Sequence, residues 1–313
     1  MNDVPSNIAD VVRTVFLVPH DFAASANPLS ELAASLPTGL RTISTSFIEN
    51  LHGVSRTLSI PFQYTYSQIH GLHWQRVHMA ERIRARGIMN EEEREPAALA
   101  SAKEKFDAYM LGEGREKVAD DVLDRLLWLK NDPESLAAAR ELTRQGIVLT
   151  LSAIEVLARD AFVYLLNNKP AYAELLLADP ANRKRFSAER VEWQTLAAYG
   201  YNLSSSLGSY FISKADLKSV PAIRGAYGAL FPAADELQKL LGDRRLWNLS
   251  HKRNLIVHKR GIVDLQYQDA TGDNLAIGDD LWVAPREVED LLETTLKVGT
   301  EVVRQVAYAS QIK

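Results

Sequence analysis

Apolar residues recur at helical spacing through most of the chain and predict a mainly helical protein. The clearest segment runs from about Glu134 to Asn168, where apolar side chains three or four residues apart form a broad face. Asn131-Asp132-Pro133 precedes it and supplies a chain break and a helix cap. Further helices are expected at residues 62–86, within 90–130, at 170–178, 188–200, 214–230 and 233–259, and from Pro285 to about Gln311.

Two stretches depart from the helical pattern. Residues 1 to about 60 hold several prolines among many serine, threonine and asparagine residues, which favours irregular structure with short strands or helices. Later, two apolar runs, from Ile262 to Tyr267 and ending at Val283, flank a turn at Thr271-Gly272-Asp273-Asn274 and predict a small β-hairpin. We therefore expect an N-terminal region over residues 1–130, irregular and then helical, and a helical domain over residues 131–313 that carries the hairpin.

Composition sets the outer limits on function. The 313 residues are 46% apolar and 24% charged, which is ordinary for a soluble globular protein. The absence of cysteine excludes disulfides, thiolate zinc sites and cysteine nucleophiles. No apolar run has the length of a membrane span, and no basic start precedes an apolar run, so a cytoplasmic protein without membrane contact is expected. The net charge of −4 requires any RNA contact to be local.

The most informative segment is the predicted helix that ends near Gly261, where basic residues and two histidines gather. At about 100° per residue, one face of this helix is polar apart from a tryptophan, and the next is apolar. Because Gly261 stands where helices commonly stop, His258 falls in the last turn, where the helix dipole favours an imidazolium that can donate a proton near neutral pH. The polar face carries Trp247, His251, Asn254 and His258, and the apolar face carries Leu246, Leu249, Ile256 and Val257.

Arg253 projects within the apolar stripe, where a guanidinium without a partner would be very costly. The long helix offers a counter-charge, because Glu155 lies near the middle of its apolar side and Ser152 lies one turn before it. An ion pair between Glu155 and Arg253 would connect the two helices, and this structural role is compatible with a place in a catalytic site. Arg253 and His258, with Asn254 beside the arginine, combine a phosphate clamp with a proton-transfer group on one short helix.

This pattern resembles the HEPN superfamily, whose hallmark is an arginine, usually a following polar residue, and a histidine four to six residues later, near the end of a late helix. Arg253, Asn254 and His258 match that motif, and residues 257–264 look like its surroundings in the RiboL-PSP-HEPN-like branch. The resemblance implies an antiparallel helical bundle that forms a homodimer, with two motifs facing one RNA phosphate. It also implies RNA cleavage without a metal or other cofactor, leaving a cyclic phosphate, and a toxin–antitoxin or antiviral defence setting with an antitoxin or defence-system partner.

Two alternatives to an endoribonuclease remain: a non-catalytic HEPN module that binds RNA, a nucleotide or a protein partner, and a structural protein whose motif only holds the bundle together. The polar face, with Trp247 as an anchor, is the expected dimer interface; the alternative is a monomer in which the N-terminal third covers that face.

His70 and His73 are spaced like the start of a metal site but lack a clear carboxylate partner, so no metal site is expected. The expected catalytic residues are Arg253, Asn254, His258 and Glu155, and the expected substrate-binding residues are Lys252, Lys259, Arg260, His251 and Ser152.

Overall fold

The computed structural model describes residues 8–19, 22–87, 90–186 and 191–311. The fold is mainly helical, as predicted, and an isolated bridge is the only strand pairing within the described residues. Among them, no helix combines the length and the apolar character that a membrane span requires. The chain forms two compact units, and residues 20–55 belong to the same unit as the late helices. The sequence had predicted a single domain boundary near residue 130. The first unit contains residues 1–19, 56–142 and 284–286, and the second contains residues 20–55, 143–283 and 287–313.

The first unit is a helical hairpin with a third helix packed against both arms. α4 contacts α5 and α6, and α1 contacts α6. The helices predicted at residues 62–86 and 90–130 are confirmed, with a break at Gly112 that separates α5 from α6. The bounds are α1 (Ile8–Arg13), α4 (Ile60–Ala85), α5 (Glu91–Leu111) and α6 (Glu113–Asn131).

The histidines singled out on α4 take part in packing between these helices. The buried His73 ring has a hydrogen bond to the Tyr109 hydroxyl at 3.1 Å through Nδ1 and to Asp121 Oδ2 at 2.8 Å through Nε2. His70 contacts Phe106 edge-to-face at 5.0 Å. In the described part of the chain, no three histidine, aspartate or glutamate side chains are grouped in a way that could hold a metal ion.

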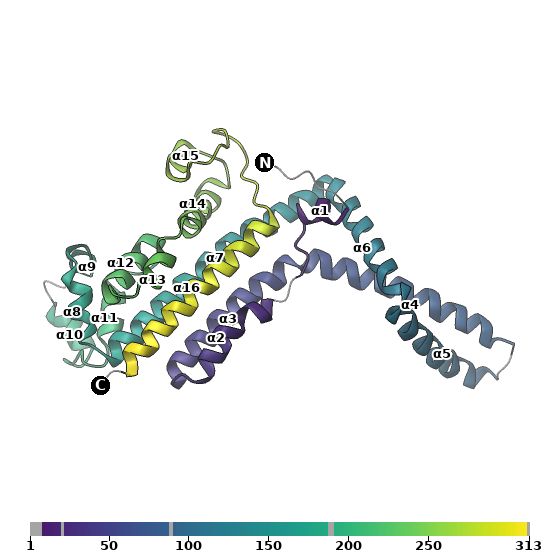
Figure 1. The fold of residues 1–313 in the computed structure, drawn as a ribbon, viewed down its shortest axis with the longest axis horizontal. Coiled ribbons are helices and arrows are strands. Elements are labelled where there is room, and N and C mark those ends of the chain that lie inside the picture. Colours follow the sequence, from purple (N-terminus) through teal and green to yellow (C-terminus); the bar gives the residue numbers. More distant parts are fainter. Residues whose placement is uncertain (1–7, 20–21, 88–89, 187–190, 312–313) are drawn as a thin grey trace. The chain divides into compact units, whose positions relative to one another are not determined.

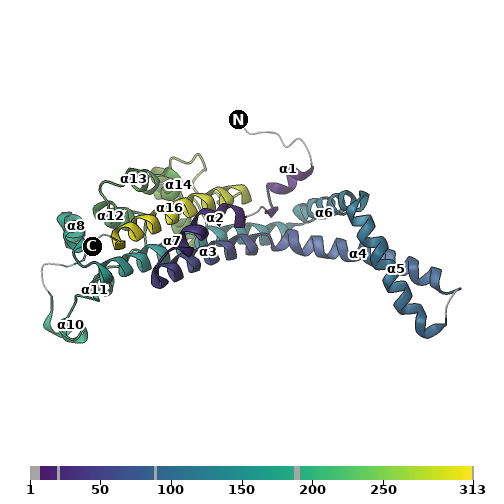
Figure 2. The ribbon, with the colours of Figure 1, turned by 60° about the horizontal axis from the view of Figure 1, so that its bottom comes forward.

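Long helices form the body of the second unit. In Figures 1 and 2, α7 and α16 run side by side in the same direction, while α3 runs the opposite way, so the bundle is only partly antiparallel. The helices approach closely at Gly299, where a Cβ atom would lie 2.2 Å from the Phe47 ring. The bounds are α2 (Phe22–Ala34), α3 (Thr38–Leu58), α7 (Pro133–Asn168) and α16 (Pro285–Gln311).

The prediction of an irregular N-terminal region is wrong for the described residues, because α1, α2 and α3 occupy most of residues 8–58. Leu40, Phe47, Leu51 and Val54 are buried in α3 at the three- and four-residue spacing of a helix. Burial of this apolar stripe outweighs the weak helix propensity of the surrounding serines and threonines.

Shorter helices build the rest of the second unit, and turn residues divide two of the predicted segments. Ser219 caps α12, so the helix predicted from residue 214 begins six residues later. Gly242-Asp243 separates α13 from α14 within the segment predicted at 233–259. The start of the helix predicted at 188–200 lies outside the described residues. The bounds are α8 (Tyr172–Ala178), α9 (Pro180–Arg185), α10 (Trp193–Ala198), α11 (Leu207–Lys214), α12 (Val220–Leu230), α13 (Asp235–Leu241), α14 (Arg244–Lys259) and α15 (Leu265–Thr271).

The predicted β-hairpin is also wrong, although its two ends do meet. Ile262 and Asp280 form an isolated antiparallel bridge, and the residues between them fold into α15 instead of two strands. The Asp264 side chain starts α15 by accepting a hydrogen bond from the Tyr267 amide, and Gly272 ends it in the left-handed region, at a φ of 65°. Helix capping at both ends of a seven-residue segment thus replaces the strand pairing.

Candidate functional site

The helix that carries the Arg-Asn-His motif has well-defined ends. At its start, the Asp243 side chain accepts a hydrogen bond from the Arg245 amide at 2.8 Å. At its end, Arg260 adopts the left-handed conformation, Gly261 has a φ of 82°, and the Gly261 amide donates to the Leu255 carbonyl at 3.1 Å. His258 therefore lies in the last turn, as predicted.

Arg144, on α7, holds this end of α14 in place and was missed by sequence reasoning. Its guanidinium donates to the carbonyls of Arg260 at 3.5 Å and Leu281 at 3.0 Å, and it forms an ion pair with Asp280. The φ of 82° at position 261 favours glycine, and a Cβ atom there would also lie 2.9 Å from the same guanidinium. One signal was present in the sequence: Arg144 and Glu155 are eleven residues apart, about three helical turns, and so share a face of α7.

The apolar side of α14 differs from the predicted stripe at one position. Leu246, Leu249 and Ile256 are buried as expected, whereas Val257 is 49% exposed and Leu255 is buried in its place. Val257 consequently belongs to the open surface beside His258.

The polar face of α14 is largely open to solvent. Asn254 and His258 are exposed, and no hydrogen bond to the His258 ring occurs among the described residues. Trp247 is 40% exposed, its ring centroid lies 4.5 Å from that of His251, and its indole Nε1 donates to the Ala270 carbonyl at 3.0 Å. The face thus runs from a tethered tryptophan to a histidine without a partner.

Glu155 and Arg253 come from different helices and act on each other electrostatically. The predicted close ion pair does not form within the described residues; instead Glu155 Oε1 and Arg253 Nε are both buried without a hydrogen-bond partner. Arg253 Nη1 donates to Asn254 Oδ1 at 3.2 Å. Burial raises the pKa of the Glu155 carboxyl, and the positive charge of Arg253 opposes that shift. Each charge is therefore the other's counter-ion without direct contact.

Two charged residues that the sequence did not point to also influence Glu155. Asp216 raises the pKa of Glu155 further and Lys218 lowers it. The two form an ion pair with each other in the segment between α11 and α12. No motif or periodicity marks this segment, so only the folded arrangement shows that it contributes to the site.

The raised pKa of Glu155 gives a pH-dependent prediction. Because the folded chain holds this proton more tightly than the unfolded chain, rising pH ionises the unfolded state first and lowers the free energy of unfolding. The loss begins near the ordinary glutamate pKa and is complete above the raised value. Glu155→Gln removes this contribution. As the pH increases from about 4.5 to 7.5, we expect the melting temperature of this variant to rise by a few degrees relative to that of the wild type.

Thermal melts across that range provide the measurement, with the exposed Glu174 as the matched control. Glu174→Gln is expected to follow the wild-type profile, because Glu174 lies on the surface of α8. If the difference between Glu155→Gln and wild type does not change with pH, Glu155 is not the perturbed group.

The expected substrate-binding residues differ in how far they are open to a ligand. Lys259 and Arg260 are exposed next to His258 and are available to an anionic ligand. Lys252 is buried and forms an ion pair with Glu287 of α16, so it is committed to the fold. His251 is partly buried, and burial lowers its pKa and so favours the neutral ring. The Ser152 hydroxyl donates to the Val148 carbonyl at 2.9 Å, one turn before Glu155.

The arrangement provides a cationic group backed by a buried acid, an amide beside it, and an exposed imidazole at the end of the same helix. Such a set can bind a phosphate through the guanidinium and transfer a proton through the imidazole. No family model, curated protein or solved structure matches the chain, so the chemistry is inferred from these residues alone.

Proposed function

We propose that this protein is a metal-independent RNA endonuclease of the HEPN type, acting in a toxin or antiviral defence setting. The observation that carries the proposal is the exposed end of α14, where His258 has no partner among the described residues while Arg253 is held near the buried Glu155. The imidazole is free to meet a substrate, and the guanidinium has a buried carboxyl within electrostatic range.

In the proposed reaction, the 2′-oxygen of a ribose attacks the adjacent phosphorus, and the bond from phosphorus to the 5′-oxygen breaks. One histidine accepts the 2′-hydroxyl proton and a second donates a proton to the leaving oxygen. Arg253 stabilises the charge on the phosphorane, and Asn254 orients the guanidinium to which it is bonded at 3.2 Å. The products are a 2′,3′-cyclic phosphate and a 5′-hydroxyl.

The direct test is incubation of the purified full chain with labelled total RNA in excess EDTA, followed by analysis of the product ends. Cleavage that leaves cyclic phosphates supports the proposal. Intact RNA under all conditions, or cleavage that needs a divalent ion, contradicts it. A non-catalytic module is the second candidate, because Glu155 near Arg253 gives the arginine a structural reason to be present; RNA that is bound and left intact would favour it.

The mechanism needs two histidines at one phosphate, and we propose that a second copy of the chain supplies the other. Two-fold pairing across the polar face of α14 would bring two His258 side chains together. Trp247, the anchor expected from the sequence, already bonds to Ala270. Val257, 49% exposed and adjacent to His258, is the better apolar anchor.

We expect the wild-type chain to have the mass of a dimer in light scattering at micromolar concentration. Val257→Asp should give monomers and lose most cleavage, because charge repulsion and desolvation oppose pairing of the two faces. Tyr308→Asp, at a 66% exposed position on α16, is the matched control and should remain dimeric. A wild-type monomer that still cuts RNA rules out the dimer.

A further inference from the structure

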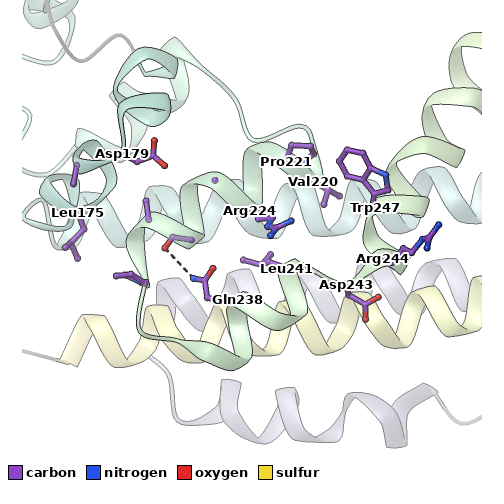
Figure 3. Close-up of a pocket in the computed structure, with 16 residues that line it drawn as sticks. Leu175, Asp179, Val220, Pro221, Arg224, Gln238, Leu241, Asp243, Arg244 and Trp247 are labelled. Carbon is purple, nitrogen blue, oxygen red and sulfur yellow. Dashed lines mark hydrogen bonds between the residues drawn. The ribbon is translucent and has the colours of Figure 1, made fainter. Parts of the chain in front are cut away.

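A pocket of about 780 Å³ lies in the second unit, between α8, α12, α13 and the start of α14. Its volume falls in the range of small-molecule sites. Figure 3 shows Arg224 between Pro221 and Leu241, with Trp247 at the end where α14 begins. The pocket therefore shares Trp247 with the polar face that carries the motif.

Arg224 places an unpaired guanidinium in the pocket lining. It is exposed on α12, and no hydrogen bond or ion pair to its side chain occurs among the described residues. The other charged lining residues are occupied: Arg244 donates to the Thr271 carbonyl, Asp243 pairs with Arg245, and Asp179 caps α9. An unpaired guanidinium in a cavity is suited to a phosphate, which it can bind through two parallel hydrogen bonds.

The rest of the pocket is suited to a flat ring. Gly225 and Gly228 leave one side of α12 without side chains, and both line the cavity. The Trp247 indole, together with Pro221, supplies an apolar surface on which a nucleobase can stack. Glycine is not required at position 225 for local packing, because a Cβ atom there would meet its nearest neighbours at 3.7 and 3.8 Å.

Gln238 adds an oriented hydrogen-bond acceptor. Its Nε2 donates to the carbonyls of Phe231 at 2.9 Å and Gly228 at 3.4 Å, which fixes the amide. Its Oε1 receives no hydrogen bond among the described residues and lies 3.3 Å from where a Cβ atom on Gly228 would be. A fixed acceptor in the pocket can bind a donor on a base edge, such as the exocyclic amino group of adenine or the N3–H of uracil.

We propose that this pocket holds one nucleotide of the bound single-stranded RNA, with its base beside Trp247 and its phosphate on Arg224. The inference rests on the proposed ribonuclease function and adds a binding subsite to it. Trp247 and His258 are eleven residues apart on one helix, about 16 Å along its axis. A strand bound in the pocket would therefore continue along the polar face towards His258.

The test measures binding without cleavage, by calorimetry on the full chain with adenosine and uridine 5′-monophosphates and with a short 2′-O-methyl oligoadenylate. We expect Arg224→Gln and Trp247→Ala each to weaken binding of the oligoadenylate and adenosine monophosphate by about tenfold or more. The uridine nucleotide should bind wild type several-fold more weakly than its adenosine counterpart, because the smaller uracil ring covers less of the Trp247 indole. Gly225→Leu, which adds bulk at a lining position without changing charge, should weaken binding of both adenosine ligands.

Lys239→Gln is the matched control, because Lys239 is an exposed cation on α13 outside the pocket lining, and it should bind like wild type. The subsite is disproved if wild type binds no adenosine ligand, or if Arg224→Gln and Gly225→Leu bind the oligoadenylate as well as wild type does. The ribonuclease proposal can fail independently of the subsite. If the wild-type chain cleaves no RNA, but Arg224→Gln binds the oligoadenylate more weakly than wild type does, the subsite is supported and the ribonuclease reaction is excluded.

Discussion

Replacing His258 by alanine is expected to abolish RNA cleavage while leaving the fold intact. Proton transfer by a positioned side chain contributes on the order of 10²–10⁴ in rate, so the variant should fall to the background of the assay. The melting temperature should change by about 1 °C or less, because the ring is exposed and makes no hydrogen bond among the described residues. RNA binding should stay within a few-fold of wild type.

Three measurements check this expectation: cleavage of labelled RNA in EDTA, affinity for an uncleavable oligonucleotide, and thermal melting. His70→Ala is the control, since His70 packs on Phe106 in the first unit, away from the motif helix in sequence, and its loss should leave cleavage unchanged. If His258→Ala cleaves at the wild-type rate, the catalytic assignment is wrong. If it no longer binds RNA, the histidine serves binding instead of proton transfer.

The parts of the fold that could be predicted are those where a long apolar face coincides with clear capping residues. α7 follows Asp132-Pro133 and α16 begins at Pro285, and both were predicted within a residue or two. α3 shows the opposite case. Its buried stripe from Leu40 to Val54 has helical spacing, but prolines and small polar residues nearby masked that pattern.

The candidate site was predictable in detail where its residues lie on one helix. The positions of Arg253, Asn254 and His258 follow from helical geometry and from the stop at Gly261. The arrangement around Glu155 depends on packing between α7, α14 and the segment before α12. Sequence spacing carries no information about such distances, which is why a close Glu155–Arg253 pair was predicted and a longer-range interaction is found.

Replacing Arg253 is expected to reduce both activity and stability, unlike the change at His258. Loss of one transition-state donor commonly lowers the rate by about 10²–10³. Arg253 is also partly buried, and its positive charge opposes the burial penalty on ionised Glu155. Arg253→Ala should therefore melt at a lower temperature than His258→Ala. Arg253→Lys should recover part of the stability but little activity. The lysine ammonium keeps the positive charge but lacks the planar guanidinium that can bind a phosphate through two parallel hydrogen bonds.

A double-mutant cycle between Arg253 and Glu155 separates the two roles. If Arg253 compensates the buried carboxyl, Glu155→Gln should restore part of the melting temperature lost in Arg253→Ala, with a coupling of about 0.5–3 kcal/mol. The restoration should be larger at pH 7 than near the ordinary pKa of glutamate, because only the ionised carboxyl needs the guanidinium. Cleavage should not recover in the double variant, since the phosphate would still lack its donor. Strictly additive melting shifts would show that the two side chains are independent and that Arg253 acts on the substrate alone.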